Sequence, residues 1–434
     1  MPRFLNLFAK RSACALLTCL LASQAGALHD ESAPQGAPLT LEETAALAVT
    51  VTPALRAQAA SVRAAAEDAV AAGQLPDPKL KAGVSELPVT TRDAFSLRRD
   101  SDTDIMLGIE QEIPRAAKRK LQTQRGQREA ALAEVALAAE SLQVQRTARL
   151  AWMDVYMPMA QQRLLGEQVM EAEGELQAQD IAYRAGRARQ ADLLAARVEF
   201  ELLRDRVRSA QQMQAHARNQ LTRWIGEAAW RPLPEQLPGW PAPAAFALLR
   251  QRLAVHPQLA VLGRETEVAQ TDIALARQSY KPDWSVGLAY GYRPDFSDML
   301  TVQVGMDLPL FTAKRQDRRL AANQARLEAV EARQEDLLRE LEAQLRLNEH
   351  DWRQLQARLA LYSSDILPQA RARIEAARAA YAAGAGDFNS ILIARRALLE
   401  VQMQQLELQV DAARHWLELD YLAPAAAHTT PETE

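Results

Sequence analysis

The side chains of this protein that could bind a metal ion or transfer a proton are few and widely spaced. None of four histidines in segments of helical composition is followed four residues later by a second ligand, the spacing that puts two ligands on one helix face. These histidines are His216, His256, His350 and His415. We therefore predict no resident metal ion and no cofactor.

Two short clusters have side chains that suit a metal. Met153, Met157 and Met159 offer the thioether sulfurs that copper prefers, but methionines at helical spacing usually fill a packing interface, and we favour packing. The segment His29-Asp30-Glu31 could bind a metal weakly or form a frayed terminus, and we favour the terminus.

The motifs of common catalytic sites are absent from the sequence. It has no glycine-rich phosphate loop ending in Lys-Ser or Lys-Thr, no His-Glu-x-x-His and no Gly-x-Ser-x-Gly. Of its 434 residues, 48% are hydrophobic but only 5% are aromatic, a composition typical of long helices. A net charge of −4 does not indicate nucleic-acid binding. We predict a protein that is not an enzyme.

Residues 1–27 have the pattern of a cleaved secretory signal peptide. Arg3, Lys10 and Arg11 precede an apolar stretch at 13–22 and an Ala-Gly-Ala cleavage site at 25–27. The alternative is an uncleaved membrane anchor, but the apolar stretch is shorter than the ~20 residues of a spanning helix.

Both cysteines, Cys14 and Cys19, lie inside this segment. A lipoprotein attached through Cys19 is a second alternative, although Thr18 is a poor residue immediately before a lipidated cysteine. Cleavage would leave 48 basic and 55 acidic side chains, a net charge of about −7. No later segment suits a transmembrane helix, so a closed β-barrel is the structure available to this chain if it enters a membrane.

The chain contains an internal repeat. Landmarks of the first half recur 204 residues later, as Pro53 does at Pro257 and Gly83 at Gly287. Farther along, the offset falls to 198, where Tyr183-Arg184-Ala185-Gly186 corresponds to Tyr381-Ala382-Ala383-Gly384. A repeat at a nearly constant offset indicates two copies of one structural unit.

Each repeat is predicted to contain a helix, two short strands and two long helices. The first repeat spans 28–231, with its first helix at 41–74, strands at about 79–88 and 103–113, and long helices at about 115–184 and 188–226. The second spans 244–422, with strands at about 283–293 and 299–309 and long helices at about 314–382 and 387–421. A stiff proline-rich linker at 232–243 separates the repeats, and we expect a disordered tail at 423–434.

In the second pair of strands, large apolar residues alternate with small or polar ones. A soluble, half-buried sheet is one interpretation, and a membrane sheet is the other. We favour the membrane, because these strands have about the 9–11 residues of a tilted membrane strand and the long helices leave little sequence to cover a sheet. The predicted lipid-facing residues are Trp284, Val286, Leu288, Tyr290, Leu300, Val302, Val304 and Met306.

Four strands cannot close a membrane barrel, since the smallest use about eight. The chain must therefore oligomerise, and two, three or four copies would each close a barrel. The long helices of about 69 residues would reach roughly 100 Å. Each pair is joined by a glycine-containing turn that favours positive φ, at Ala185-Gly186-Arg187 and Ala383-Gly384-Ala385.

This layout over residues 39–422 resembles the TolC-like outer-membrane factor family, as do the paired Tyr-x-x-Gly turns. Local segments are similar to the branch associated with cobalt-zinc-cadmium or copper-silver efflux. These are Leu75-Pro76-Asp77-Pro78-Lys79-Leu80, Leu87-Pro88-Val89, Phe95-Ser96-Leu97 and Gln111-Glu112-Ile113-Pro114 with Lys118-Arg119.

The resemblance implies a mainly α fold with a small membrane β-barrel, in which a homotrimer forms one twelve-stranded barrel continued by a long α-helical barrel. It also implies a periplasmic adaptor that contacts the two turns and an inner-membrane proton-driven pump. Asp192 and Tyr381 match positions of the gate that closes the helical end in this family. The second hairpin departs from the pattern at Gly386, Ser390 and Ile393, which leaves Asp387 or other bonds to close it. Asp192 and Asp387 could equally be helix N-caps.

We therefore expect an outer-membrane channel with a long periplasmic portion. It would be the passive exit duct of a tripartite efflux system for heavy-metal cations. The alternatives are a channel for drug efflux or type I protein secretion, and a periplasmic coiled-coil adaptor.

Overall fold

In a computed structural model, residues 37–424 of the chain are described. The predicted signal peptide at 1–27, Cys19, the segment 29–31 and most of the C-terminal tail lie outside the described residues. Within the described part, the order of helices and strands predicted from the sequence repeat is confirmed: a helical segment, two strands and two long helices occur twice.

The first repeat consists of α1 (Leu41–Val51), α2 (Pro53–Ala71), β1 (Lys79–Ser85), β2 (Asp104–Ile113), α3 (Ala116–Arg184) and α4 (Gln190–Ile225), followed by a 3-10 turn, η1 (Gly226–Trp230). The second repeat consists of α5 (Phe246–Leu253), α6 (Pro257–Gln278), β3 (Trp284–Tyr292), β4 (Met299–Met306), α7 (Gln316–Leu361), the π-helical turn η2 (Tyr362–Ile366), α8 (Leu367–Ala382) and α9 (Phe388–Leu422).

The single helix expected at 41–74 is wrong, because the chain breaks at Thr52 into α1 and α2. Thr52 has extended backbone angles, φ −64° and ψ 119°, as expected for a residue that precedes a proline. Pro53 then takes the first helical position, where its missing N–H has no intrahelical partner to lose. Pro257 begins α6 in the same way, so this break is a feature of both repeats.

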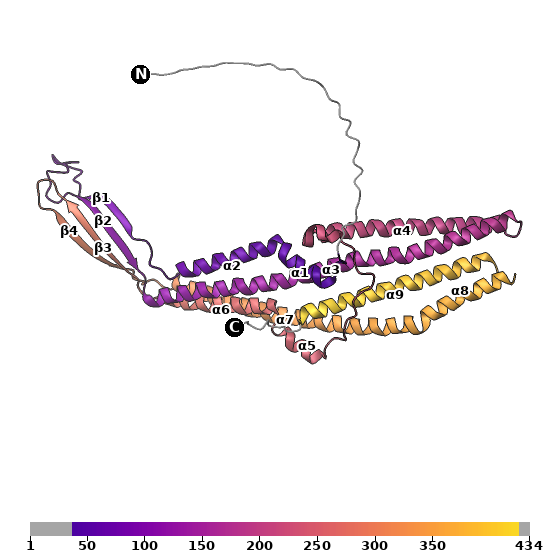
Figure 1. The fold of residues 1–434 in the computed structure, drawn as a ribbon. Helices are drawn as coiled ribbons and strands as arrows, with labels where there is room; N and C mark the ends of the chain where they lie inside the picture. The colour runs from indigo at the N-terminus through magenta and orange to yellow at the C-terminus, as the bar shows by residue number, and fades with distance from the viewer. Residues whose placement is uncertain (1–36, 425–434) are drawn as a thin grey trace, which may run out of the picture.

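The helix expected at 314–382 is also interrupted. A single π-turn, η2, separates α7 from α8. Pro368 follows immediately, in the first turn of α8. A proline inside an α-helix removes one backbone hydrogen bond and clashes with the preceding turn, so the wider turn accommodates it, and α8 continues at an angle to α7 (Figure 1). α3 contains Pro158 yet is continuous over its 69 residues.

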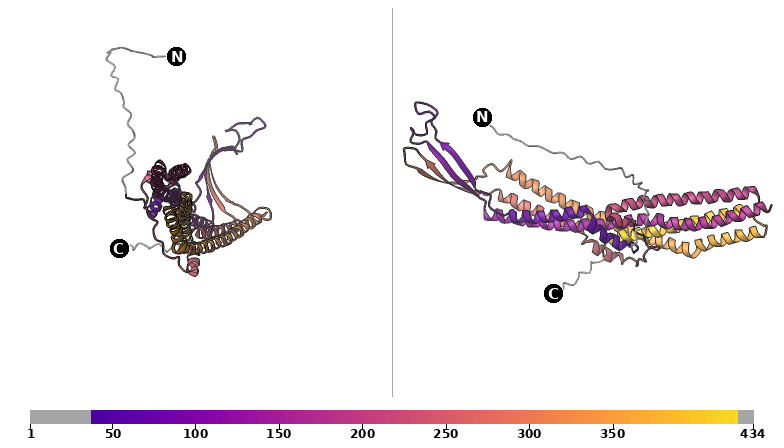
Figure 2. Two further views of the ribbon diagram at one scale, coloured as in Figure 1. Left: turned by 90° about the vertical axis from the view of Figure 1, so that its right-hand side faces the viewer. Right: turned by 45° about the horizontal axis from the view of Figure 1, so that its top comes forward.

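The four strands form one antiparallel sheet in the order β1-β2-β3-β4. β2 and β3 come from different repeats, and they pair over nine residues, from Ile105 opposite Tyr292 to Ile113 opposite Trp284. The sheet projects from one end of the molecule, and the helices extend away from it (Figures 1 and 2). At the far end, the α3/α4 and α8/α9 hairpins finish in two turns (Figure 1). No helix among the described residues is long and apolar enough to cross a membrane.

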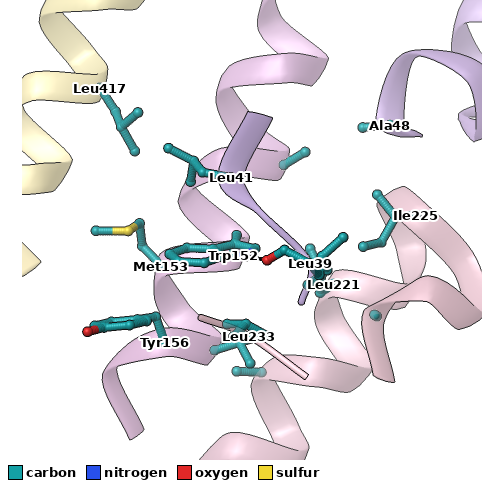
Figure 3. Close-up of a cluster of buried hydrophobic side chains, with 14 of the residues drawn as sticks. Leu39, Leu41, Ala48, Trp152, Met153, Tyr156, Leu221, Ile225, Leu233 and Leu417 are labelled. Atoms are coloured by element: carbon teal, nitrogen blue, oxygen red, sulfur yellow. Dashed lines mark hydrogen bonds between the residues drawn. The ribbon is translucent and has the colours of Figure 1, made fainter. Parts of the chain in front are cut away.

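The main hydrophobic core lies midway along the molecule, where α1, α3, α4 and α9 meet (Figure 3). Trp152 of α3 is fully buried there, and its indole N–H donates a hydrogen bond to the Leu39 carbonyl over 2.9 Å. Its ring stacks on Tyr156 at 5.4 Å. Because this core joins the start of the first repeat to the last helix of the second, both repeats depend on it for their relative position.

Candidate functional site

One face of the sheet is apolar along all four strands except at Gln111. The strand register places the large apolar strand residues that are described in the next two sentences on this one face. All eight predicted lipid-facing residues lie on this apolar face. It also contains Leu80, Val84, Ile105, Leu107, Ile109, Ile113 and Tyr292, which extend it over the first repeat.

These apolar side chains are exposed to an unusual degree, between 38% and 76% of their surface. The figures show no helix lying over the sheet among the described residues (Figures 1 and 2). A half-buried soluble sheet would cover such a face, because apolar surface of this extent is costly in water. The soluble-sheet interpretation is therefore not supported by the described chain.

The opposite face of the sheet is mostly polar or small, with Met106 and Met299 as its two large apolar residues. Lys79 pairs with Glu112 and Lys81 with Glu110 across β1 and β2. Ser285, Thr301 and Gln303 line the same face on β3 and β4, together with glycines. The sheet therefore has one face suited to an apolar solvent and one suited to water.

The two hairpin turns at the far end of the molecule are nearly identical. Gly186 and Gly384 have φ values of +71° and +70°, which a residue with a side chain rarely adopts. The amide of Arg187 donates to the Ala182 carbonyl over 2.8 Å, and the amide of Ala385 donates to the Ala380 carbonyl over 2.9 Å. The 198-residue offset is thus a true structural correspondence at this end.

The three gate candidates lie near these turns, but no hydrogen bond joins them to one another in the described chain. Asp387 is the N-cap of α9 and accepts a hydrogen bond from the Ser390 amide over 2.9 Å. Hydrogen bonds from Ser390 lower the pKa of this carboxyl. The hydroxyl of Tyr381 accepts a bond from Gln179 at 3.3 Å, and its ring lies 6.0 Å from that of Phe388.

Asp192 differs from Asp387 in its local role. The N-cap of α4 is Arg189, and its side chain makes no capping bond. Asp192 lies in the first turn of α4 and pairs with Arg189 at 3.2 Å. The N-cap alternative is therefore right for Asp387 and wrong for Asp192.

A buried ion cluster close to the turns was missed by the sequence analysis. Arg395 of α9 is only 2% exposed and donates to Glu175 at 2.8 Å and to Glu171 at 2.9 Å, both on α3. Arg378 of α8 lies 3.7 Å from Glu175. Burial raises the pKa of Glu175, while the two arginines oppose that rise. The cluster joins the hairpin of one repeat to the hairpin of the other.

The repeat-related position has different chemistry. Arg197 corresponds to Arg395 at the 198-residue offset, but it is exposed. The counterparts of Glu171 and Glu175 are Gln369 and Arg373, an amide and a second cation. The contact between the two hairpins of one chain therefore brings opposite charges together. The repeat-related positions have an exposed arginine, an amide and a second cation, so their charges are not complementary.

Replacing Arg395 by alanine should destabilise the packed hairpins by about 1–3 kcal/mol, because Glu171 and Glu175 lose their buried partner. The loss stays in this range because Glu171 is half-exposed and water can solvate its charge. Denaturant titrations of the purified protein at pH 7 measure this loss, with Arg197→Ala as the control on the exposed position. The loss should shrink toward pH 4.5. Without Arg395 the pKa of Glu175 rises further above its unfolded value, so protonation restores stability as the pH falls. Equal losses in both variants, or a loss independent of pH, would contradict this role.

His256, His415 and the three methionines occupy structural positions. His256 is buried and caps α6, accepting a bond from the Gln258 amide at 3.3 Å, and burial lowers its pKa. His415 contacts Asn348 at 2.8 Å. Met153 is part of the main core, and Met157 and Met159 pack against it, as the packing interpretation predicted. Among residues 37–424, no group of three His, Cys, Asp or Glu side chains is placed to hold a metal ion.

Sequence comparison finds one family. The family described as "Outer membrane efflux protein" matches residues 248–423, which is most of the second repeat. No curated protein matches the chain significantly.

Comparison with solved structures finds the same fold in several proteins. The CusC structure, whose study concerns folding and transmembrane channel formation, aligns with a TM-score of 0.75 at 17% identity and covers 91% of this chain and 96% of that chain. The outer membrane protein VceC from Vibrio cholerae gives 0.73 at 19% identity, with 88% and 95% covered. The open state of the MtrE outer membrane channel from Neisseria gonorrhoeae gives 0.68 at 17% identity, with 88% of each chain covered. At these identities the comparison shows the fold.

Proposed function

We propose that this chain, with the fold of outer-membrane channels and a second repeat that matches the outer membrane efflux protein family, is the outer-membrane channel subunit of a tripartite efflux system. The observation that carries the proposal is the exposed apolar face of the sheet at one end of a long helical body. Lipid covers that face, and the helices extend into the periplasm as a duct. The opposite, polar face then lines water.

An oligomer follows from the open edges of the sheet. β1 and β4 are its outer strands, and each leaves a row of backbone groups without a partner in the described chain. Lipid cannot satisfy those groups, so β4 of one copy pairs with β1 of the next until a barrel closes. Three copies give a twelve-stranded barrel, which is the number that the family resemblance implies.

Placing an arginine on the apolar face tests this assignment directly. Val302→Arg should reduce the heat-modifiable oligomer in the outer-membrane fraction several-fold, because a cation near the bilayer centre costs about 2–4 kcal/mol. Gln303→Arg is the matched control, since its side chain is on the polar face of the same strand. Membrane fractionation and gels of unheated samples measure the difference. If both variants assemble equally well, the face does not contact lipid.

The far end of the molecule would receive the other components. We propose that the turns at 185–187 and 383–385 contact a periplasmic adaptor, which connects the channel to an inner-membrane pump. Their exposure and their distance from the sheet support this placement (Figure 1). Asp192, Tyr381 and Asp387 lie beside these turns and are our candidates for residues that close the duct.

Removing the carboxylates tests the gate. Asp192→Ala and Asp387→Ala should raise single-channel conductance in planar bilayers, because each removes a polar contact beside the turns where we propose that the duct closes. Asp387→Asn separates charge from helix capping, since asparagine caps a helix about as well as aspartate does. A rise in this variant too assigns the effect to the charge. Unchanged conductance in all three variants would leave both residues as structural elements of their helices.

The substrate class is the finer part of the proposal. The segments around residues 75–80, 87–89 and 111–119 resemble the heavy-metal branch, and a surplus of acidic charge in the processed chain suits the passage of cations. Channels for drug efflux or type I protein secretion share this architecture. A periplasmic adaptor is disfavoured, because the chain has two long hairpins and a sheet with an exposed apolar face.

Deleting the gene should sensitise cells to at least one of copper, silver, zinc, cobalt and cadmium, because the export route for the cation is lost. Growth inhibition across metal concentrations measures this effect, and the wild-type gene supplied in trans should restore tolerance. Val302→Arg, for which we expect several-fold less assembled oligomer, should restore tolerance only in part. Unchanged tolerance to all five metals, together with sensitivity to drugs, would transfer the chain to the drug-efflux class.

A further inference from the structure

A basic pocket lies where the sheet joins the helices. The β4–α7 connection and the end of α6 form a cavity of about 400 Å³. It is lined by Ser279, Lys314, Arg315, Gln316, Arg318, Arg319 and Ala322. Four of these seven residues are cations, and none of the seven is acidic.

The four cations outnumber the one carboxylate in the same stretch of sequence, Asp317. Lys314, Arg315, Arg318 and Arg319 are exposed, and none of them forms an ion pair among residues 37–424. Nearby carboxylates are already engaged. Asp317 accepts a hydrogen bond from the Tyr280 hydroxyl at 2.6 Å, and Asp283 pairs with Lys118 of the first repeat. Four like charges so close together repel one another, and a bound anion relieves that repulsion.

A buried polar group adds a second observation. Gln316 is 8% exposed and lines the same pocket, and its side-chain carbonyl oxygen accepts no hydrogen bond in the described structure. A buried amide group normally has partners, so this unpaired oxygen, which is itself buried, marks a polar group in the pocket wall that the described chain does not satisfy. The pocket is thus charged and incomplete.

Apolar residues precede the cations in the same connection. Leu310 and Phe311 are exposed over 73% and 81% of their surface. Most other large apolar side chains of the described chain are less exposed. Leu310 and Phe311 come shortly after β4, which ends at Met306 and whose apolar face we assign to lipid. Within ten residues, 310–319, the chain therefore passes from exposed apolar side chains to a cation cluster, which matches the two parts of an amphiphile.

We propose that this pocket binds the phosphate of an anionic phospholipid in the leaflet that faces the helices, with the acyl chains against Leu310 and Phe311. The inference rests on the proposed outer-membrane location. Arginine and lysine are the side chains best suited to phosphate oxygens, and clusters of them beside a membrane segment attract anionic lipid. In a trimer, three such sites would form a collar around the base of the barrel.

The test compares two charge-matched variants of the full-length protein. Lys314→Gln/Arg318→Gln/Arg319→Gln removes three cations from the pocket. Arg333→Gln/Arg339→Gln/Arg346→Gln removes three exposed cations from the same helix far from the sheet. Fluorescent phosphatidylglycerol is titrated into each purified protein in neutral detergent, with phosphatidylcholine and inorganic phosphate as separate competitors.

We expect the pocket variant to lose at least about tenfold in affinity for phosphatidylglycerol, since each basic side chain contributes measurably to anionic-lipid binding. The control variant should stay within about twofold of the wild type. Phosphatidylcholine and inorganic phosphate should compete poorly, because the first lacks net charge and the second lacks acyl chains. Phe311→Ser should weaken lipid binding without altering the charge of the pocket.

Three outcomes would overturn the inference. Unchanged lipid affinity in the pocket variant removes the site. Equal competition by inorganic phosphate makes it a small-anion site. Dissociation of the oligomer in the pocket variant shows that a neighbouring copy supplies the missing negative charge. Each leaves the proposed function standing if the variant still reaches the outer membrane and conducts ions. Absence of the wild-type protein from that membrane would instead refute the proposed function.

Discussion

The constraint on which this structure depends is the demand of backbone amides and carbonyls for partners where no water is present. The sheet has four strands and two open edges, and one face is apolar along every strand. Neither feature is stable in an isolated soluble chain, since the open edges and the apolar face would both promote aggregation. In the proposed function, further copies of the chain pair with the open edges and lipid covers the apolar face. Oligomerisation and membrane insertion are thus one requirement rather than two.

Alternation and repetition made much of this fold predictable. The period of two located all four strands, and the recurrence of Pro53 at Pro257 and Gly186 at Gly384 identified the two units. Local interruptions were harder. The break at Thr52 was available from the proline that follows it, but that signal was outweighed by the helical composition on both sides. The π-turn at Tyr362–Ile366 depends on how α7, α9 and Pro368 share space, which a single sequence does not show.

The candidate site was predictable only in part, for a related reason. Exposed strand residues follow a pattern, whereas Arg395 does not differ in sequence from Arg197. Both lie in similar Leu-Leu-Ala or Leu-Ile-Ala contexts, and only the position of α3 against α9 makes one a buried cluster and leaves the other exposed. The pairing of Asp192 with Arg189 likewise depended on where α4 begins. Roles that arise between helices need the arrangement of those helices.

The pairing of β2 with β3 has a geometric consequence for the assembled protein. It is the one strand junction inside the chain that joins different repeats, and its register runs from Ile105 opposite Tyr292 to Ile113 opposite Trp284. In a ring of repeats, the junction between β4 and the next β1 is the equivalent one. In the proposed barrel, the stagger summed over all strand junctions fixes the tilt of the strands, and strand number and tilt together fix the bore. The register of β2 against β3 thus shows, within one chain, the strand offset to expect where two copies meet.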